Sequence, residues 1–121
     1  MSITFITVQG SDDNGWNITE VTALPEFKIN EKILASHFSD LKIANVAAKA
    51  IAEDNQIQLV PENTSVITVM KSSDTYLPIS IGPFGKIQGE GQSVPTMEGA
   101  ARQAHQYAQK YKLPLILPQK V

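Results

Sequence analysis

Residues 65–81 read SVITVMKSSDTYLPISI and have the pattern of a β-hairpin. The segments 65–70 and 76–81 are rich in β-branched and aromatic residues, which favour strands. Residues 71–75 lie between them and hold two serines and an aspartate, which are typical of a turn. This hairpin predicts a sheet, and the chain on either side of it is interpreted from there.

After the hairpin, glycines at 82, 85, 89 and 91 interrupt the chain, and residues 86–88 fit a short strand between them. Thr96 is a good helix cap, and Pro114 requires the helix to end by about Leu113. Residues 115–117 predict a last short strand. Apolar residues recur with helical spacing between cap and proline: Met97, Ala100, Ala101, Ala104, Tyr107, Ala108 and Tyr111.

The first half has the same order of elements. Residues 3–9 and 16–24 predict two strands around a turn with Asn14-Gly15, and residues 27–29 a short third strand. We interpret residues 31–38 as a short helix or a loop. Ser39 is the preferred cap of a helix, and residues 56–60 predict a strand. The helix is expected to bury more than one side, because many positions are apolar: Leu41, Ile43, Ala44, Ala47, Ala48, Ala50 and Ile51.

The two halves align as an internal repeat. An offset of 57 residues places Ser39 on Thr96 and Phe27 on Phe84, and near the start an offset of 61 places residues 6–8 on 67–69. A unit of this size buries little surface alone, and two units can share a core. We therefore expect an α+β fold: one compact domain, residues 1–121, made of two β-β-β-α-β pseudo-repeats (about 1–61 and 62–121), with two main helices on mostly antiparallel sheet.

Composition excludes several classes of function. The 121 residues contain no cysteine, so disulfides, thiolate metal sites and cysteine nucleophiles are excluded. The net charge is -2, with one arginine among ten basic residues, so we expect no binding of duplex DNA. No apolar run is long enough for a membrane span, and residues 1–5 do not resemble a signal peptide. A cytoplasmic protein is expected.

The second half resembles the HicB-like antitoxin domain. The resemblance is carried by the two hairpin strands, the corner at 82–85, the third strand with Gly89, and the helix opening Thr96-Met97-Glu98-Gly99-Ala100. The first half is similar, with a corner at 24–27 and a helix from Ser39. The resemblance implies a domain that masks a small RNA-cleaving toxin. In that family a C-terminal segment binds the operator, and no such segment is expected after Pro118.

Four aromatic residues near the corners are the candidate partner-binding residues: Trp16, Phe27, Tyr76 and Phe84. The competing interpretation, which the residue types favour, is that they pack in the core across the two halves. Tyr107 and Tyr111 are expected in the core.

The spacing of the other polar residues matches no known pattern of a catalytic or metal site. His105 is expected on the helix surface, and His37 has one candidate co-ligand, Asp40, but no third. A pair of acidic turns, one in each half, could be formed by Asp12, Asp13 and Asp74 and could bind a divalent ion. Aspartate is common in turns, however, because its side chain bonds to the nearby backbone. The glycine-rich run 82–91 matches no phosphate-binding loop.

The leading hypothesis is a non-enzymatic protein-binding module that masks its partner through a strand edge or the corner aromatics. An alternative is a small-molecule-binding protein or divergent enzyme with a site between the halves. A third is binding of single-stranded RNA, for which Lys28, Lys32, Lys42 and Lys49 are the group to check. No cofactor or metal is expected, and self-association is left open.

Overall fold

The computed structural model describes residues 2–82, 86–89 and 91–118. The first half forms a four-stranded sheet of order β3-β2-β1-β4, with α1 packed on it. Its elements are β1 (Ile3–Ser11), β2 (Gly15–Leu24), β3 (Lys28–Phe38), α1 (Leu41–Asn55) and β4 (Gln58–Val60). The first three strands are antiparallel neighbours, and β4 runs parallel to β1.

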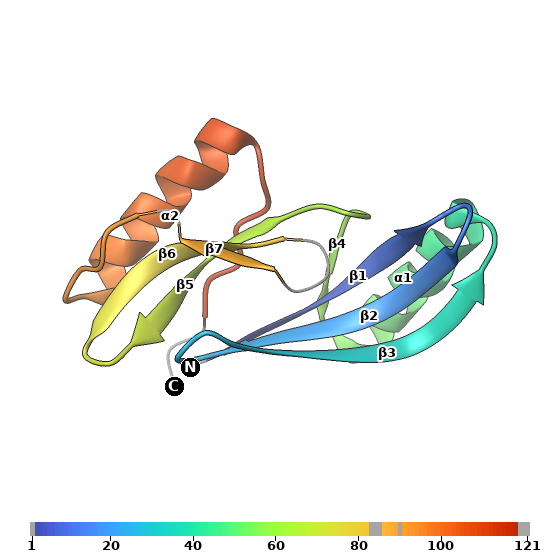
Figure 1. The fold of residues 1–121 in the computed structure, drawn as a ribbon, viewed down its shortest axis with the longest axis horizontal. Helices are drawn as coiled ribbons and strands as arrows, with labels where there is room; N and C mark the ends of the chain where they lie inside the picture. Colours follow the sequence, from blue (N-terminus) through green and yellow to red (C-terminus); the bar gives the residue numbers. More distant parts are fainter. Residues whose placement is uncertain (1, 83–85, 90, 119–121) are drawn as a thin grey trace.

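The second half repeats this plan with shorter strands. A three-stranded antiparallel sheet has the order β5-β6-β7, formed by β5 (Val66–Ser72), β6 (Thr75–Ile81) and β7 (Ile87–Gly89), followed by α2 (Met97–Tyr111). After α2, Leu115 makes a parallel bridge to Ile67, as β4 does to β1. The expected α+β class, mostly antiparallel with two main helices, is confirmed (Figure 1).

The two sheets share one apolar core, and each helix covers a sheet from the other side. Ile3, Phe5 and Val21 from the first sheet cluster with Val66 and Ile79 from the second. Strand alternation sends the next residues to the opposite face, where Ile6 and Val8 pack under α1, and Ile67 and Val69 pack under α2. The sheets overlap over part of their length, so the molecule is elongated, with α1 at one end and α2 at the other (Figure 1).

Residues 31–38 were predicted as a short helix or loop, and this prediction is wrong. They belong to β3, which spans eleven residues and pairs with β2 along its length. The pattern was hard to recognise because β3 is an edge strand with most side chains in solvent, so it lacks the apolar alternation of a half-buried strand. Register shifts near Ile18 let Leu34, Ala35 and Phe38 join the cluster beneath α1.

Two details of the helices also differ from expectation. The cap of α1 is Asp40, not Ser39, since the Asp40 carboxylate accepts a hydrogen bond of 2.8 Å from the Lys42 N–H. The helix buries one side, not several: Ile43 and Val46 are exposed on the other. Thr96 caps α2 as predicted, accepting from the Gly99 N–H at 3.1 Å.

The correspondence between the helices is closer than the sequence alignment indicated. α1 begins at Leu41 and α2 at Met97, an offset of 56 residues rather than 57. Both helices have fifteen residues, and both end at a cap residue in the left-handed conformation, Gln56 and Lys112. An offset of 56 aligns the buried alanines, which are Ala44, Ala48 and Ala52 in α1 and Ala100, Ala104 and Ala108 in α2. Neither of these helices has the length and apolarity required to cross a membrane.

Candidate functional site

Trp16 lies inside the first half. It is 7% exposed and belongs to the cluster beneath α1, together with Ile18 and Ala48. Its ring N–H donates a 3.0 Å hydrogen bond to the Oδ1 of Asp12 in the β1–β2 turn. Trp16 therefore packs the core and closes the turn, and Asp12 has a local structural partner.

Phe27 lies at the junction of the two halves. It is in the loop between β2 and β3, has a positive φ of 61°, and is 44% exposed. Its backbone N–H donates to the sulfur of Met70 in β5 at 3.0 Å. Of the candidate aromatics that the structure describes, Phe27 is the one with a large accessible side chain at the junction.

Tyr76 is half-buried in the cluster beneath α2. Its backbone pairs with Val94 in both directions at 2.8 Å, and the Lys71 ammonium lies 5.9 Å from its ring centre. Phe84 lies outside the described residues. Trp16, Phe27 and Tyr76 thus belong to three different environments and do not form one surface.

Tyr111 was expected in the core but is 48% exposed, and it stacks on Tyr107 with ring centres 6.2 Å apart.

The longest end strand in the described part of the chain is β3. It is an end strand of its sheet, so one side of its backbone pairs with β2 and the other side has no neighbouring strand among the described residues. Ile33 lies in the middle of β3 and is 60% exposed, although it pairs with the buried Thr19. An exposed strand edge with an apolar side chain is a site at which another strand can add.

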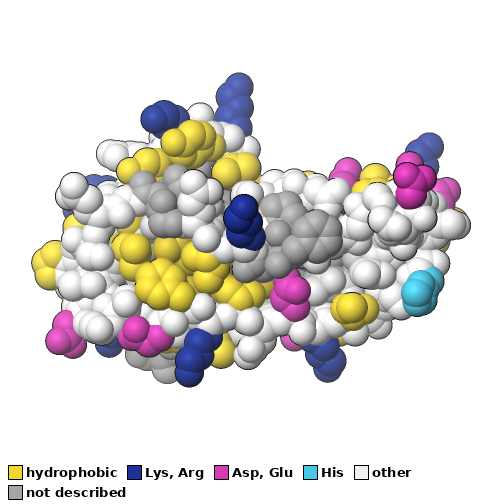
Figure 2. Space-filling view, in the orientation of Figure 1, with side chains coloured by type: hydrophobic (Ala, Val, Ile, Leu, Met, Phe, Trp, Pro, Cys, Tyr) yellow, Lys and Arg dark blue, Asp and Glu magenta, His cyan; other side chains and the backbone are white. Residues whose placement is uncertain are grey.

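Ile33 lies on the same face of β3 as Ile29, with the exposed Glu31 between them. Ile29 and Leu77 of β6 are half-buried against the shared core, and Phe27 lies beside them because it bonds to Met70, the cross-strand partner of Leu77. Figure 2 shows apolar side chains gathered on this side, over the second sheet. We call Phe27, Ile29, Ile33 and Leu77 together the edge surface.

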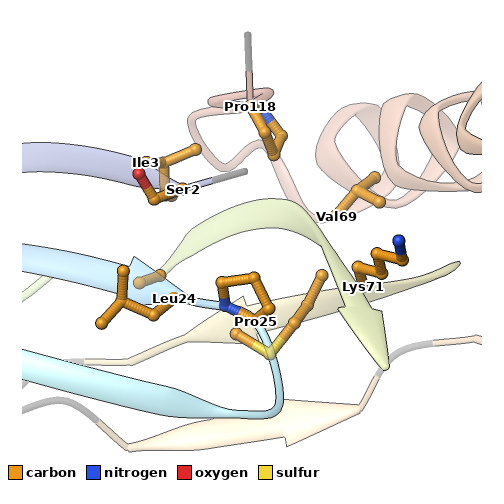
Figure 3. Close-up of a pocket in the computed structure, with 9 residues that line it drawn as sticks. Ser2, Ile3, Leu24, Pro25, Val69, Lys71 and Pro118 are labelled. Carbon is orange, nitrogen blue, oxygen red and sulfur yellow. The ribbon is translucent and has the colours of Figure 1, made fainter. Parts of the chain in front are cut away.

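The cavity between the halves is small. Figure 3 shows its lining from the start of β1, the end of β2, the end of β5 and the chain near Pro118. Its volume is about 10 Å³, which accommodates about one water molecule. A larger open groove of about 330 Å³ lies within the second half, lined by Ser65, Ser80, Gln88, Tyr111 and Leu113.

The titratable residues do not converge. His37 and His105 are exposed on different elements, β3 and α2. Asp12 and Asp74 occupy corresponding turns, but the β1–β2 and β5–β6 turns lie at opposite ends of the molecule (Figure 1). Among the described residues, no group of three histidines or carboxylates is placed to hold a metal ion.

The four lysines considered for RNA binding lie on two elements. Lys28 and Lys32 are on β3, and Lys42 and Lys49 are on α1. Glu20 of β2 pairs directly with Lys32, so acidic groups interrupt the basic ones. The arrangement gives no continuous basic track for a phosphate backbone.

Sequence reasoning missed Ile33 and Glu26. Ile33 was inside the segment interpreted as a helix or loop, so no sequence pattern indicated that it lies on an open strand edge. Glu26 bonds to the β5–β6 turn, a contact between residues 47 positions apart that no local pattern reveals.

Comparisons with protein-family models, with curated proteins and with solved structures found no match.

Proposed function

We propose that this chain is a non-enzymatic, cytoplasmic protein-binding module that masks a partner protein at the edge surface. The observation that carries the proposal is the open edge of β3, eleven residues long, with Ile33 60% exposed at its centre. A partner strand that paired with β3 would extend the sheet and satisfy its outer backbone groups. The backbone would supply affinity, and side chains on alternate positions would supply specificity.

The character of β3 suits a selective partner. Lys28, Glu31 and Lys32 are exposed on it, and charged edge residues oppose indiscriminate pairing with other strands. Ile29 and Ile33 share one face of β3 with Glu31, and Ile29 packs against the shared core. A partner strand with apolar residues on that face would bury them, whereas a polar strand would not.

The repeated architecture supports the proposed relation to HicB-like domains. Each half has three antiparallel strands and a capped helix, which is the order that the resemblance implies, and a parallel segment follows each helix. We propose that the two halves arose by duplication and that the first kept a long third strand while the second has a short one. The partner would then be a small protein, such as an RNA-cleaving toxin, covered by the longer strand.

The alternative functions have less support. A ligand site between the halves would require a cavity, and the cavity lined by Ile3, Leu24 and Val69 holds about one water molecule. The groove near Tyr111 is roomy enough for a small molecule, but its lining comes from the second half alone. For RNA binding, the four lysines considered above form no continuous basic track.

The test uses a pair of matched variants. Ile33→Glu places a charge at the centre of the edge surface, and Val46→Glu places the same charge on α1, at a residue that is 71% exposed. Neither side chain is in the core, so both variants should fold as the native chain does, which circular dichroism checks. Native chain and both variants are used to capture proteins from a lysate of the native host, and bound proteins are identified by mass spectrometry.

We expect one stoichiometric protein with the native chain and with Val46→Glu, and its loss with Ile33→Glu. Hydrogen exchange of the purified complex should show slowed exchange in Lys28–Phe38. If the partner cleaves RNA, addition of the chain should inhibit cleavage, and Ile33→Glu should not. Binding that survives Ile33→Glu and leaves β3 unprotected would contradict the proposal. A retained metabolite with no protein would favour the small-molecule alternative.

A further inference from the structure

The outer face of α1 is apolar although it is exposed. Val46 is 71% exposed and Ile43 is 58% exposed, and Ala50 is exposed too. These three residues follow the spacing i, i+3, i+7, so they form one stripe along the helix. Their stripe is opposite the buried stripe of Ala44, Ala48 and Ala52. Exposed β-branched residues aligned in this way expose apolar surface to water along the middle of the helix.

The charges on the same helix oppose its dipole. Lys42 lies in the first turn, where the helix is positive, and the last turn holds Glu53 and Asp54, where it is negative. The helix has no acidic residue in its first turn and no basic residue in its last. Within one molecule this order is unfavourable, whereas α2 has the favourable order, with Glu98 first and Lys110 last.

A second copy of the helix, running antiparallel, reverses this disadvantage. In that arrangement the Lys42 end of one helix lies beside the Glu53 and Asp54 end of the other, and the opposing dipoles attract. Val46 of one copy lies near the small Ala50 of the other, so the apolar stripes can approach closely. A parallel pair would place like charges side by side. We propose that two copies of this chain associate through an antiparallel, two-fold symmetric contact between their α1 helices.

The exposed fractions of Ile43 and Val46 show that this surface is accessible. α1 lies at the end of the molecule farthest from the second sheet and α2, on the side of the first sheet that faces away from the shared core (Figure 1). A single pair of fifteen-residue helices covers less than the ~800 Å² per partner of a standard interface. The association should therefore be weak and reversible.

Sedimentation of the purified chain over a range of concentrations tests the proposal. We expect a monomer–dimer equilibrium, and Val46→Glu should weaken it at least ~10-fold by burying two carboxylates. Ile33→Glu is the control, since it adds the same charge at a similarly exposed residue on β3. A chain that stays monomeric up to about 1 mM, or a dimer that Val46→Glu leaves unchanged, would overturn the proposal.

A charge exchange tests the antiparallel orientation. Lys42→Glu should weaken the dimer about fivefold at low salt, because both symmetric copies of the contact are lost. Adding Asp54→Lys to Lys42→Glu should restore association; failure to do so would overturn the antiparallel pairing.

This proposal is independent of the masking function, since Ile33→Glu tests the edge surface and Val46→Glu tests the outer face of α1. If Val46→Glu abolished capture of a partner protein and left self-association intact, α1 would belong to that partner, and the proposed α1–α1 contact would be refuted.

Discussion

The carboxylate of Glu26 accepts a hydrogen bond from the backbone N–H of Ser73, with 2.7 Å between Oε1 and N. Glu26 lies in the β2–β3 loop and Ser73 in the β5–β6 turn, and both have a positive φ. The Glu26 N–H donates in turn to the Lys71 carbonyl at 3.1 Å. One residue thus joins two turns that belong to different halves, and it fixes the end of β3 against the second sheet.

Glu26→Ala should lower the free energy of unfolding by about 1 kcal/mol, because the Ser73 N–H loses a charged acceptor. Glu26→Gln keeps an acceptor oxygen and should lose less. Urea denaturation measures both, and Asp13→Ala, in the exposed β1–β2 turn, is the control for removing a surface carboxylate. Equal losses in Glu26→Ala and Asp13→Ala would show that the bond between the halves contributes nothing.

The cap of α1 offers a second test. Asp40→Ala should cost about 1 kcal/mol, because the Lys42 N–H loses its acceptor, and Asp40→Asn should cost less. Ser39→Ala should change the thermal midpoint little, since the Ser39 side chain does not cap the helix. The reverse order of the Asp40 and Ser39 variants in a thermal melt would place the start of the helix at Ser39.

The contrast between Ser39 and Asp40 illustrates what local sequence can decide. Both are good cap residues, and the apolar period that follows them tolerates a shift of one residue. The cap of α2 was found because Thr96 had no such competitor nearby. The helices, both hairpins and the α+β class followed from local patterns, since those elements bury regular apolar stripes.

The edge surface was harder to predict because it depends on what is absent beside β3. Solvent covers most of β3, so its sequence is not constrained by a core and shows no alternation. Its bonds to β2 are main-chain bonds, which leave no signature in side chains. Phe27 was found as a corner aromatic, but its proximity to Met70 required the fold. The exposed side of α1 was misjudged as well, because its apolar residues were interpreted as additional core.

Gly10 gives a third prediction, based on backbone geometry. Its φ is 141°, and an added Cβ would overlap the carbonyl oxygen of Gly15 across the hairpin. Gly10→Ala should therefore lower the free energy of unfolding by about 3 kcal/mol, from strain and displacement of the β1–β2 turn. Gly82→Ala is the control, because its Cβ would meet neighbours at 3.5 Å or more. Chemical denaturation of the two variants should separate them clearly, and similar stabilities would contradict the strained hairpin.

The last prediction concerns a buried hydroxyl in the shared core. Thr68 is 1% exposed, and its Oγ1 has no hydrogen-bond partner in the described part of the structure. Leaving a buried hydroxyl unpaired costs about 1–3 kcal/mol, and valine has nearly the same shape without that cost. Thr68→Val should therefore raise the free energy of unfolding by about 1 kcal/mol.

A matched threonine shows whether this gain comes from the unpaired hydroxyl. Thr7 is also buried, but its hydroxyl donates to the Pro61 carbonyl at 3.5 Å, so Thr7→Val should be neutral or destabilising. Thr68→Ser keeps the hydroxyl and removes a methyl group, so it should be less stable than the native chain. Guanidinium titrations of the three variants provide the comparison. A loss of stability in Thr68→Val would mean that the hydroxyl forms a bond in solution, and the core between the two sheets would then be more polar than its packing indicates.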